Sequence, residues 1–482
     1  MVALTAIHDW VDAPGTLVSW GPSAACLAKV AQAPVSSVPP SYQQEQHIRT
    51  YRAHSANELE MARLLIPSWN IPGRGDIRAM TFVINAYLRR HDTYHSWFEL
   101  TADDEAAESV TRHTVANPSD IAFVPTKHGE VTASQWREHI LETPNPLQWD
   151  CFRFGVIQRA DHFTFYACID HLHADAMFVV PLFGELHTNY LALVEGGAPI
   201  KLPEAGRYLD YCVRQRRAAG DLTLESSDVG EWVEFLRRNG GTLPKFPLPL
   251  GDPDVPCTGD LITVRLLDAH DSDRFESVCA QAGVRFIGGV FACAAIAERE
   301  LADITAYHVI TPTTTRSTPT EFNTTGWFTG IVPISIDVAG KTFVEVARAG
   351  QSAFDAGLHL ANVPIERVFE LTSSVPDIRS AEPGVPMLSY LDTGLPPLNP
   401  VVMGQWQSHN GTLYTDLGAA NQMGMWVNRR DTGTTLTVAY PDNPVARESV
   451  AQYVDLMKML YLRAVAGRAD SLSSPRIPRA TA

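Results

Sequence analysis

The sequence has no paired-cysteine framework, no signal peptide and no apolar run long enough to span a membrane. Its seven cysteines stand singly, without a Cys-x-x-Cys pair, at Cys26, Cys151, Cys168, Cys212, Cys257, Cys279 and Cys293. This pattern argues against a disulfide scaffold and predicts reduced, mostly buried thiols. The first residues, MVALTAIHDWVDAPG, lack a basic start and an apolar core, and the most apolar run, MFVVPLF, is far too short for a span. We therefore expect a cytoplasmic protein.

Positive charge is also scarce, which limits the classes of partner. The chain has 54 acidic residues against 38 Lys and Arg, giving a net charge of −16. Phosphate contacts require a basic surface, so nucleic acid is not an expected partner. The composition is globular, with 45% hydrophobic and 19% charged residues. A chain of 482 residues is long enough for two domains, which we place at residues 1–215 and 216–482.

The first half predicts a β-hairpin followed by a helix. Residues 152–158 and 162–170 are aromatic and β-branched runs separated by RAD, as in a hairpin. A helix is expected from there to about Val194, before the glycines of EGG. The first forty residues are rich in Pro, Ser and Ala and predict an irregular arm, with a helix starting at Ser41.

The second half repeats the mixture of strands and helices after a region rich in Pro and Gly, residues 197–258. Its last helix is predicted from about Pro444 to Ala466, with Asn443 as N-cap and Gly467 at the C-cap. The expected fold class is α/β in two halves.

The segment DHLHADA, residues 170–176, carries the most reactive side chains. In an extended segment His171, His173 and Asp175 share one face, and His and Asp are good zinc ligands. A metal-dependent hydrolase using HLHAD is therefore one interpretation. However, the dinuclear pattern expects another His after the Asp, where this chain has Ala176.

Two other interpretations of the same segment need no metal. It could be a polar strand end with solvated histidines, although a cluster of His and Asp directly after a buried strand is costly unless it is used. Alternatively, one His is a general base, because a neutral imidazole can take a proton from an attacking hydroxyl. His171 and Asp175 have the spacing H-x-x-x-D. Cys168 lies in the preceding strand without an obvious activating base, so we treat it as core.

The segment DHLHADA resembles the HHxxxDG motif of the condensation-domain and CoA-dependent acyltransferase superfamily. His171 falls on the catalytic second His and Asp175 on the structural Asp, whereas Asp170 replaces the first His and Ala176 the Gly. Further motif-like segments follow the family order along the chain: SYQQEQHI (41–48), RHDTYHSWF (90–98), YLDYCVRQ (208–215), TPTTTRSTPTEFNTTGWFTGIVPI (311–334) and NVPIERVFE (362–370). QAPVSSVPPSYQQEQHIR, PLQWDCFRFG and TTGWFTG look like the mycobacterial-type polyketide-associated acyltransferases.

The resemblance implies two chloramphenicol-acetyltransferase-like halves packed as a V-shaped pseudo-dimer, with a channel between them. It implies an O-acyltransferase that moves a long-chain or polyketide acyl group from a thioester to a hydroxyl of trehalose or a trehalose-based glycolipid. His171 is then the general base and Asp175 shapes the loop. The donor is acyl-CoA or an acyl group on a polyketide synthase carrier domain, with coenzyme A or phosphopantetheine as part of the substrate. No metal and no further cofactor are expected. A monomer is expected, and contact with the inner face of the membrane stays open.

Two departures from the family pattern affect the partner of Asp175. The Arg expected in the RHExLRTxF segment is His95 here, so Asp175 could be held by His95 or by another cation such as Arg316. Arg316 could instead contact a phosphate of coenzyme A. In TTGWFTG, Trp327 and Phe328 are expected in the core or the channel wall, and Gly326 and Gly330 where backbones approach closely.

Two other functions remain compatible with the fold. A condensation domain makes peptide bonds, but the chain shows no carrier-protein or adenylation module. A catalytically degenerate member would bind lipid or a synthase without turnover; Asp170 and Ala176 favour it, and the intact His171 argues against it.

Overall fold

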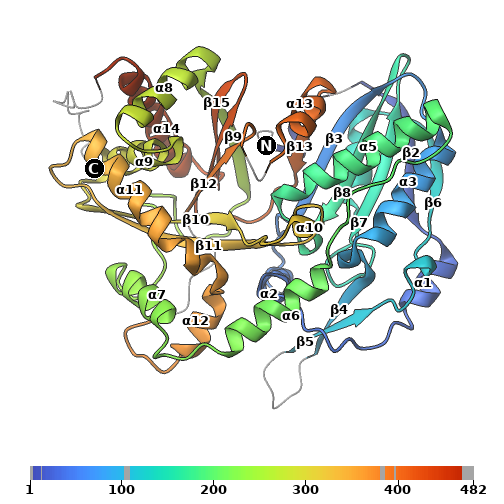
Figure 1. Cartoon of the computed structure of the whole chain (residues 1–482), viewed down its shortest axis with the longest axis horizontal. Coiled ribbons are helices and arrows are strands. Elements are labelled where there is room, and N and C mark those ends of the chain that lie inside the picture. The colour runs from blue at the N-terminus through green and yellow to red at the C-terminus, as the bar shows by residue number, and fades with distance from the viewer. Residues whose placement is uncertain (1–3, 12, 102–108, 380–385, 396–397, 469–482) are drawn as a thin grey trace.

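The computed structural model describes residues 4–11, 13–101, 109–379, 386–395 and 398–468. Two halves lie side by side in Figure 1, each built on its own β-sheet. The blue-to-green half on the right contains a seven-stranded sheet, and the half on the left a six-stranded sheet. The predicted α/β plan in two halves is confirmed.

The first sheet has the strand order β1-β13-β3-β8-β7-β2-β6. Its strands are β1 (Leu4–Ala6), β2 (Gly15–Pro22), β3 (Leu64–Pro72), β6 (Phe123–Val131), β7 (Phe152–Gln158), β8 (His162–Asp170) and β13 (Thr412–Thr415). The predicted hairpin is β7 and β8, which pair antiparallel. Along β8, Phe165 and Ala167 belong to one core cluster, whereas Tyr166 and Cys168 belong to another. This alternation buries both faces of the strand.

The prediction of an irregular N-terminal arm is wrong for its first half. Strand β2 pairs on one side with β6 and on the other with β7, and Trp20 is fully buried. The short helix α1 (Ala24–Val30) follows it. The strand was missed because strand formation depends on tertiary pairing more than on local propensity.

Helices cover both faces of the first sheet. They are α2 (Tyr42–Ala56), α3 (Ile77–Arg90), α4 (Ala133–Leu141) and α5 (Val179–Gly196), and a separate small sheet pairs β4 (Ser96–Thr101) with β5 (Ser109–Thr114). Ser41 caps α2 as predicted, through a capping box with Gln44. Helix α5 ends before Gly197, which adopts φ 72°, as the glycine signal predicted. Pro181 lies in its first turn, where it leaves the helix intact.

The second sheet has the order β11-β10-β12-β14-β15-β9. Its strands are β9 (Gly259–Asp268), β10 (Ala306–Thr314), β11 (Thr329–Asp337), β12 (Met387–Asp392), β14 (Gly424–Arg430) and β15 (Gly433–Pro441). One face packs against α8 (Ala269–Gln281), α9 (Phe286–Ala302), α11 (Phe343–Gly357) and α14 (Pro444–Val465) in the largest core cluster. Asn443 caps α14 and Gly467 follows it, as predicted. The opposite face meets α7 (Ser227–Arg238), η6 (Leu358–Asn362) and α12 (Ile365–Leu371).

The two halves exchange segments. Strand β13, which comes late in the sequence, joins the first sheet and pairs antiparallel with β3. The segment between β10 and β11, with the short helix α10 (Pro319–Phe322), reaches from the second sheet to the first half (Figure 1). Helix α6 (Tyr208–Gly220) runs between the halves and contains the predicted division at residues 215 and 216. That division stays a prediction. The strands of the two sheets do not separate at a single point of the chain, because β13 belongs to the first sheet.

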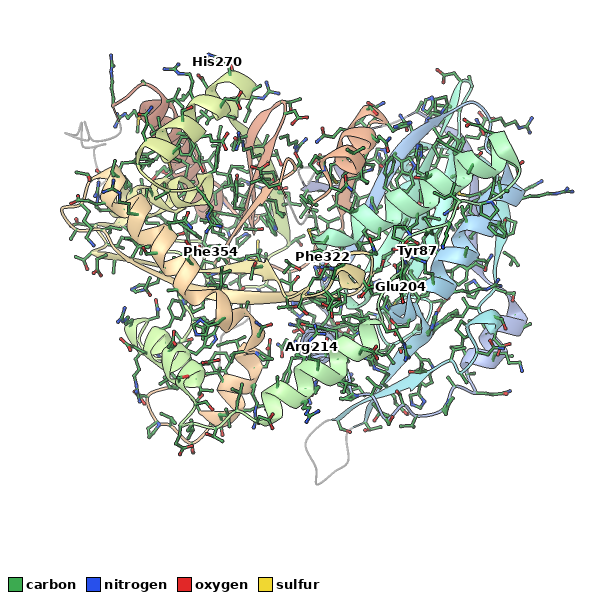
Figure 2. The ribbon with its side chains drawn as sticks, viewed as in Figure 1. Tyr87, Glu204, Arg214, His270, Phe322 and Phe354 are labelled. Atoms are coloured by element: carbon green, nitrogen blue, oxygen red, sulfur yellow. The ribbon has the colours of Figure 1, made fainter. Side chains whose placement is uncertain are left out.

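Side chains of the first half hold this crossing segment in place. Tyr87 and Arg214, labelled in Figure 2, lie on either side of it. The Tyr87 hydroxyl lies 2.6 Å from the Thr325 hydroxyl, and Arg214 donates to the Glu321 carboxylate at 2.6 Å. The segment therefore belongs structurally to both halves.

One described helix, Ala176–Gly196, is long and apolar enough to cross a membrane, contrary to the expectation from the sequence. Over half of its most apolar window, 56%, is buried, and it packs against α3 and α13 (Pro400–Ser408). The pair α8 and α9 passes the same test only together and is bent by 93°. A core helix of a globular protein meets the same criterion, so these helices are weak evidence for membrane spans.

Candidate active site

His171 lies in a tight turn that begins where β8 ends. The turn consists of η4 (His171–His173) and η5 (Ala176–Phe178), and α5 follows directly. The Asp170 carboxylate accepts from the Leu172 amide at 3.0 Å, and the His171 amide donates to the Arg63 carbonyl at 2.7 Å. The backbone of His171 is therefore fixed on both sides.

The side chains of HLHAD do not converge on one point, because residues 171–173 form a 3-10 turn and not an extended segment. His173 is fully buried between the Tyr94 and Phe152 rings, with its Nδ1 3.2 Å from the Thr93 hydroxyl. Among the described residues, the groups whose ligand atoms could share one ion are Asp228, Glu231 and His359, and Asp268, His270 and Asp271. Neither group includes the HLHAD segment, so its geometry does not favour the metal interpretation.

The His171 ring packs against the Trp327 ring, with 4.0 Å between their centroids. Burial lowers the pKa of His171 to about 4, and the electrostatic interaction with His47 adds to this shift. The backbone of His171 and the carboxylates of Asp175 and Asp170 oppose it. The imidazole is therefore neutral near pH 7, which is the form that accepts a proton.

Asp175 is bound by groups from the opposite half of the molecule. Its Oδ2 accepts from Arg316 Nη1 at 2.7 Å and its Oδ1 from Arg316 Nη2 at 3.1 Å. The Phe328 amide donates to the same carboxylate at 2.9 Å, and the Met177 amide at 3.0 Å. The Asp175 amide donates in turn to the Gly326 carbonyl at 3.1 Å. Four hydrogen bonds thus occupy the two oxygens of the Asp175 carboxylate. Asp175 therefore holds the turn in place, and no free lone pair is left to accept a proton.

Arg316 is an internal ion-pair partner in this structure. Its Nε donates to the Glu321 carbonyl at 3.0 Å and its Nη2 also reaches the Thr324 carbonyl at 3.3 Å. All three guanidinium nitrogens therefore have partners within the protein. Its side chain is only 2% exposed, which does not fit the alternative of a contact with a coenzyme A phosphate.

His95, the other candidate partner of Asp175, lies elsewhere. The short turn η2 (Asp92–His95) directs its ring back under α3, where Nε2 hydrogen-bonds the Leu88 carbonyl at 3.0 Å. Burial lowers the pKa of His95, so its charged form is disfavoured there. The cation that replaces the missing Arg of the motif therefore comes from the other half of the chain.

Asp170, which stands where the family motif has a first His, anchors two neighbouring elements. It is fully buried, and its carboxylate lies 2.7 Å from His47 Nε2 of α2 and 2.7 Å from Arg63 Nη1. Burial alone would raise the pKa of Asp170, but His47 and Arg63 lower it to about 2. The carboxylate therefore stays ionised and ties α2 and Arg63, the residue before β3, to the start of the turn.

A cavity of about 410 Å³ opens beside His171 between the two halves. The first half contributes Gln43, His171 and Met177, and the second half contributes residues of β10, β11, η6, α12, β12 and β14. Its lining is mostly apolar and its size lies within the usual range of small-molecule sites. Trp327 forms part of the wall, whereas Phe328 is fully buried against Tyr208 and Tyr211.

Gly330 and Gly326 lie where backbones and rings approach closely, as expected. A Cβ on Gly330 would lie 1.9 Å from the Ala361 carbonyl oxygen, and one on Gly326 would lie 2.3 Å from the Tyr208 ring. Gly330 thus lets η6 approach β11 and form one side of the cavity. Cys168 is buried in β8, where burial raises the pKa of its thiol to about 12. It stays protonated and is part of the core, as expected.

Four residues of this site escaped the sequence interpretation: Gln43, His47, Glu366 and Trp426. The first three lie inside segments that carried the resemblance, but nothing in the pattern singled them out. Trp426 stands in GMWVNRR, which reads as an ordinary strand. Only their positions in space connect these residues, because the fold brings α2, α12 and β14 around one cavity.

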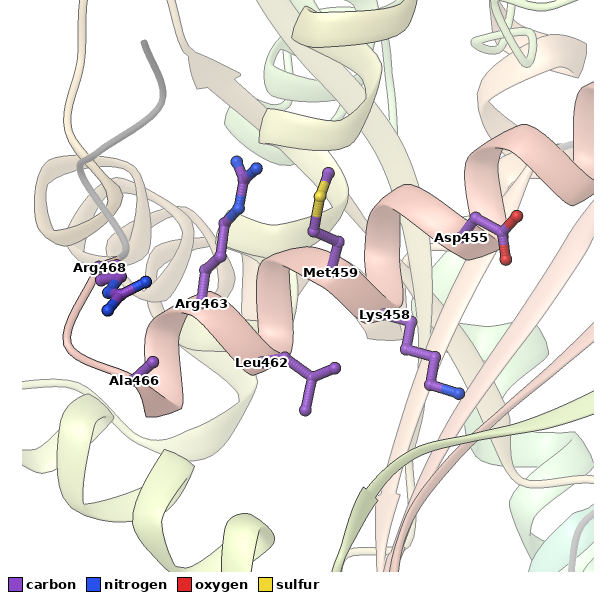
Figure 3. A pocket seen from close by; sticks show the side chains of 7 residues that line it. All are labelled: Asp455, Lys458, Met459, Leu462, Arg463, Ala466 and Arg468. Carbon is purple, nitrogen blue, oxygen red and sulfur yellow. The ribbon is translucent and has the colours of Figure 1, made fainter. Parts of the chain in front are cut away.

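A second, open depression lies on the outer surface at the end of α14 (Figure 3). Asp455, Lys458, Met459, Leu462 and Arg463 of that helix line it together with Ala466 and Arg468, which follow the helix. None of the motif segments contributes to it. Residues of the motif segments instead line the cavity at His171.

Comparisons with known proteins show to which family the chain belongs. The Condensation domain family matches residues 66–376. The chain is 51% identical over 472 residues to the trehalose-2-sulfate acyltransferase PapA2 of Mycobacterium tuberculosis, covering 98% of this chain and 99% of the relative. It is 48% identical over 466 residues to the 2'-acyl-2-O-sulfo-trehalose (hydroxy)phthioceranyltransferase PapA1 of the same species, covering 97% of this chain and 89% of the relative.

Solved structures show the same relationship. The fold matches that of the PapA2 acyl transferase with a TM-score of 0.91 at 50% identity, covering 96% of this chain and 99% of that chain. The condensation domain of the monacolin K polyketide synthase MokA shares the fold alone, with a TM-score of 0.66 at 15% identity over 89% of this chain and 99% of that domain.

Two sheet-based halves with a histidine-bearing turn at the cavity between them define an acyltransferase of the condensation-domain type. The chain belongs to the Condensation domain family, and its relatives among the polyketide-associated acyltransferases cover nearly its whole length. The resemblance inferred from the motifs and the fold that it implied are confirmed.

Proposed function

We propose that this acyltransferase moves a long-chain or polyketide acyl group from a thioester to a hydroxyl of trehalose or a trehalose-based glycolipid, with His171 as the general base. The observation that carries the proposal is the place of the half-buried His171 imidazole in the wall of the cavity between the halves. The lowered pKa of His171 keeps the ring in the form that accepts a proton. The names of relatives that cover nearly the whole chain, trehalose-2-sulfate acyltransferase among them, support the acceptor class.

The proposed step is one acyl transfer without a covalent enzyme intermediate. His171 takes the proton of the acceptor hydroxyl as the oxygen attacks the thioester carbonyl. The tetrahedral intermediate collapses, the carbon–sulfur bond breaks, and the thiolate takes the proton that His171 holds. An ester and a free thiol result, so atoms and charge balance. A positioned base of this kind contributes roughly a hundred- to ten-thousand-fold to the rate, and fixing both substrates contributes further.

Asp175 has a separate part in the proposed mechanism. It holds the turn against the second half through Arg316 and the Phe328 amide, and it does not carry the proton. His171 then keeps its place beside Trp327 while substrates enter and leave.

The donor and the location of the reaction are part of the proposal. Acyl-CoA and an acyl group on a carrier domain both present a thioester on a phosphopantetheine arm, so either fits the chemistry. We place the reaction in the cytoplasm, with contact to the inner face of the membrane where the acceptor is a lipid.

The test is thiol release from long-chain acyl-CoA with and without trehalose, followed by mass spectrometry of the sugar. Wild type is compared with His171→Ala and with His359→Ala, a half-exposed histidine outside the cavity. We expect trehalose-dependent thiol and acyl-trehalose from wild type and His359→Ala, and a loss of at least a hundredfold in His171→Ala. Activity that survives in His171→Ala would overturn the base assignment, and activity abolished by a chelator would favour metal chemistry instead.

The catalytically degenerate alternative makes a different prediction in the same assay. A lipid- or synthase-binding protein would bind the thioester equally well in wild type and His171→Ala and release no thiol with either. Binding of a nonhydrolysable alkyl-CoA thioether, measured by calorimetry, separates this outcome from an inactive preparation.

A further inference from the structure

The cavity beside His171 has a floor that runs in one direction across the second sheet. Side chains alternate along each strand, so Pro312 of β10, Ile331 of β11 and Ser389 of β12 face the cavity. Leu388 and Met425, from the alternate positions, face the helices of the large core. The floor therefore starts at β11 and β10, which adjoin Trp327, and continues over β12 to β14.

Trp426 lies at the far end of this floor. It is paired with Ser389 across β12 and β14, and β14 lies two strands from β10, roughly 10 Å across the sheet at the usual spacing. Beyond it, the described residues of β15 and β9 include none that lines the cavity. The large indole is thus the last wall residue along the floor.

The position of the indole is set by a glycine on the same strand. A Cβ on Gly424 would lie 3.1 Å from Cη2 of Trp426, so the ring lies back over Gly424. Gly424 is paired with Met387 on the neighbouring strand, which also lines the cavity. The ring therefore covers the paired residues Gly424 and Met387, at which the cavity floor ends.

The walls of this arm suit a hydrocarbon chain. Met177, Ile331, Met387 and Leu391 line the cavity together with Trp426, and no Lys or Arg is among the described lining residues. The polar lining residues Gln43, Thr314, Thr329 and Glu366 belong to α2, to the ends of β10 and β11 and to α12, whereas Ser389 is the polar residue paired with Trp426. A sugar at that end of the floor would leave most of its hydroxyl groups without partners, which costs free energy. The phosphates of a donor would also lack a cation. An acyl chain needs neither.

We propose that this arm of the cavity receives the acyl chain of the donor and that Trp426 limits the length of chain that the enzyme accepts. The inference rests on the proposed acyl transfer and names its donor subsite. Burial of each further methylene strengthens binding by about fourfold. Affinity should therefore rise with chain length until the chain meets the indole, and then stop rising.

The test measures binding and turnover separately. Nonhydrolysable alkyl-CoA thioethers from octyl to eicosyl are titrated by calorimetry into wild type, Trp426→Ala, Trp426→Phe and Ser389→Val. The matching acyl-CoA series is assayed with trehalose. We expect wild type to reach a plateau, and Trp426→Ala to continue rising by about fourfold per methylene over several further carbons. Octyl-CoA affinity should change less than twofold in that variant.

Two further variants keep the test decisive if Trp426→Ala does not fold. Ser389→Val fills the floor opposite the indole, so the plateau should come at a shorter chain. Trp426→Phe should move it modestly toward longer chains. Phe82→Ala, at a half-exposed position on α3 outside the cavity, should leave the series unchanged.

Three outcomes would overturn the inference. The plateau could stay in place in both Trp426 variants, or Ser389→Val could leave long chains unaffected. Trp426→Ala could instead raise the KM for trehalose while the chain-length series stays fixed, which would make the indole part of the acceptor site. The thioether titration needs no acceptor, so a failure of the proposed trehalose acylation shows as absent turnover with the binding series intact.

Discussion

The Asp175 carboxylate and the Arg316 guanidinium join the two halves through two hydrogen bonds, 2.7 Å and 3.1 Å long, between residues 141 positions apart in the sequence. Their side chains are 3% and 2% exposed. Asp175 lies within the turn that carries His171, and Arg316 lies in the segment that crosses from the second sheet. The pair therefore fixes the position of His171 relative to the cavity wall that the second half supplies.

Replacing Arg316 by Ala should destabilise the fold by about 3–5 kcal/mol, because it leaves a buried carboxylate without its cation. Arg316→Lys keeps the charge but loses the forked geometry, so its cost should be smaller. Urea denaturation measures both. The control is Arg237→Ala, which breaks the half-exposed pair with Asp377 and should cost no more than about 1 kcal/mol. Equal stability of the two alanine variants would contradict the structural role of the crossing pair.

The pH dependence of kcat/KM should show an acid limb well below the ordinary histidine range, because burial lowers the pKa of His171 to about 4. A base with a lowered pKa is neutral above that pKa, so activity should persist as the pH falls below 6.5 and decline only toward about 4. His47→Gln removes an electrostatic interaction that contributes to the shift, and its acid limb should move to higher pH. An acid limb near 6.5 in wild type would argue against His171, as placed here, being the base.

Glu298→Gln should stabilise the protein increasingly as the pH rises. Glu298 lies in α9 with only 8% of its surface exposed, and burial raises the pKa of its carboxyl to about 8. The unfolded carboxyl has a pKa near 4.5, so the folded state binds the proton more tightly. Wild-type stability is therefore lost as the pH rises from about 4.5 through about 8, and the neutral amide avoids this loss. Melting temperatures at mildly acidic and mildly alkaline pH measure the effect.

The exposed Glu138 provides the control for this prediction, since Glu138→Gln should give the same small difference from wild type at both pH values. A Glu298→Gln variant that follows the wild-type pH dependence would show that the carboxyl is not the source of the loss.

Gly330→Ala should destabilise the fold by about 1–3 kcal/mol and reduce turnover, because the added methyl would lie 1.9 Å from the Ala361 carbonyl oxygen. Neither backbone can give way without moving η6, which lines the cavity. Gly21→Ala is the matched control, since a Cβ there meets no atom within 4 Å. Thermal unfolding and acyl-CoA turnover measured on both variants test the prediction. Two variants of equal stability would show that β11 and η6 can separate at little cost.

Local chemistry explains which parts of the fold could be predicted. Ser41 and Gln44 form a capping box three residues apart, and the hairpin of β7 and β8 is separated by a three-residue turn. Each of these signals lies within a few neighbouring residues. Strand β2 was missed because its partners, β6 and β7, lie more than one hundred residues away in the chain. The periodicity of a sequence does not show which distant strands will pair.

The candidate site divides in the same way. The sequence by itself determined that a polar segment with His171 follows a buried strand. It also contained the ordered motifs that relate the chain to its family. These depend on residues that are adjacent or nearly so. Only the tertiary structure decided that Arg316 and not His95 binds Asp175, that His47 binds Asp170, and that Trp426 lines the cavity. Each of these contacts joins elements that become neighbours only when the two sheets pack around one cavity, because burial and charge pairing act through space and not along the chain.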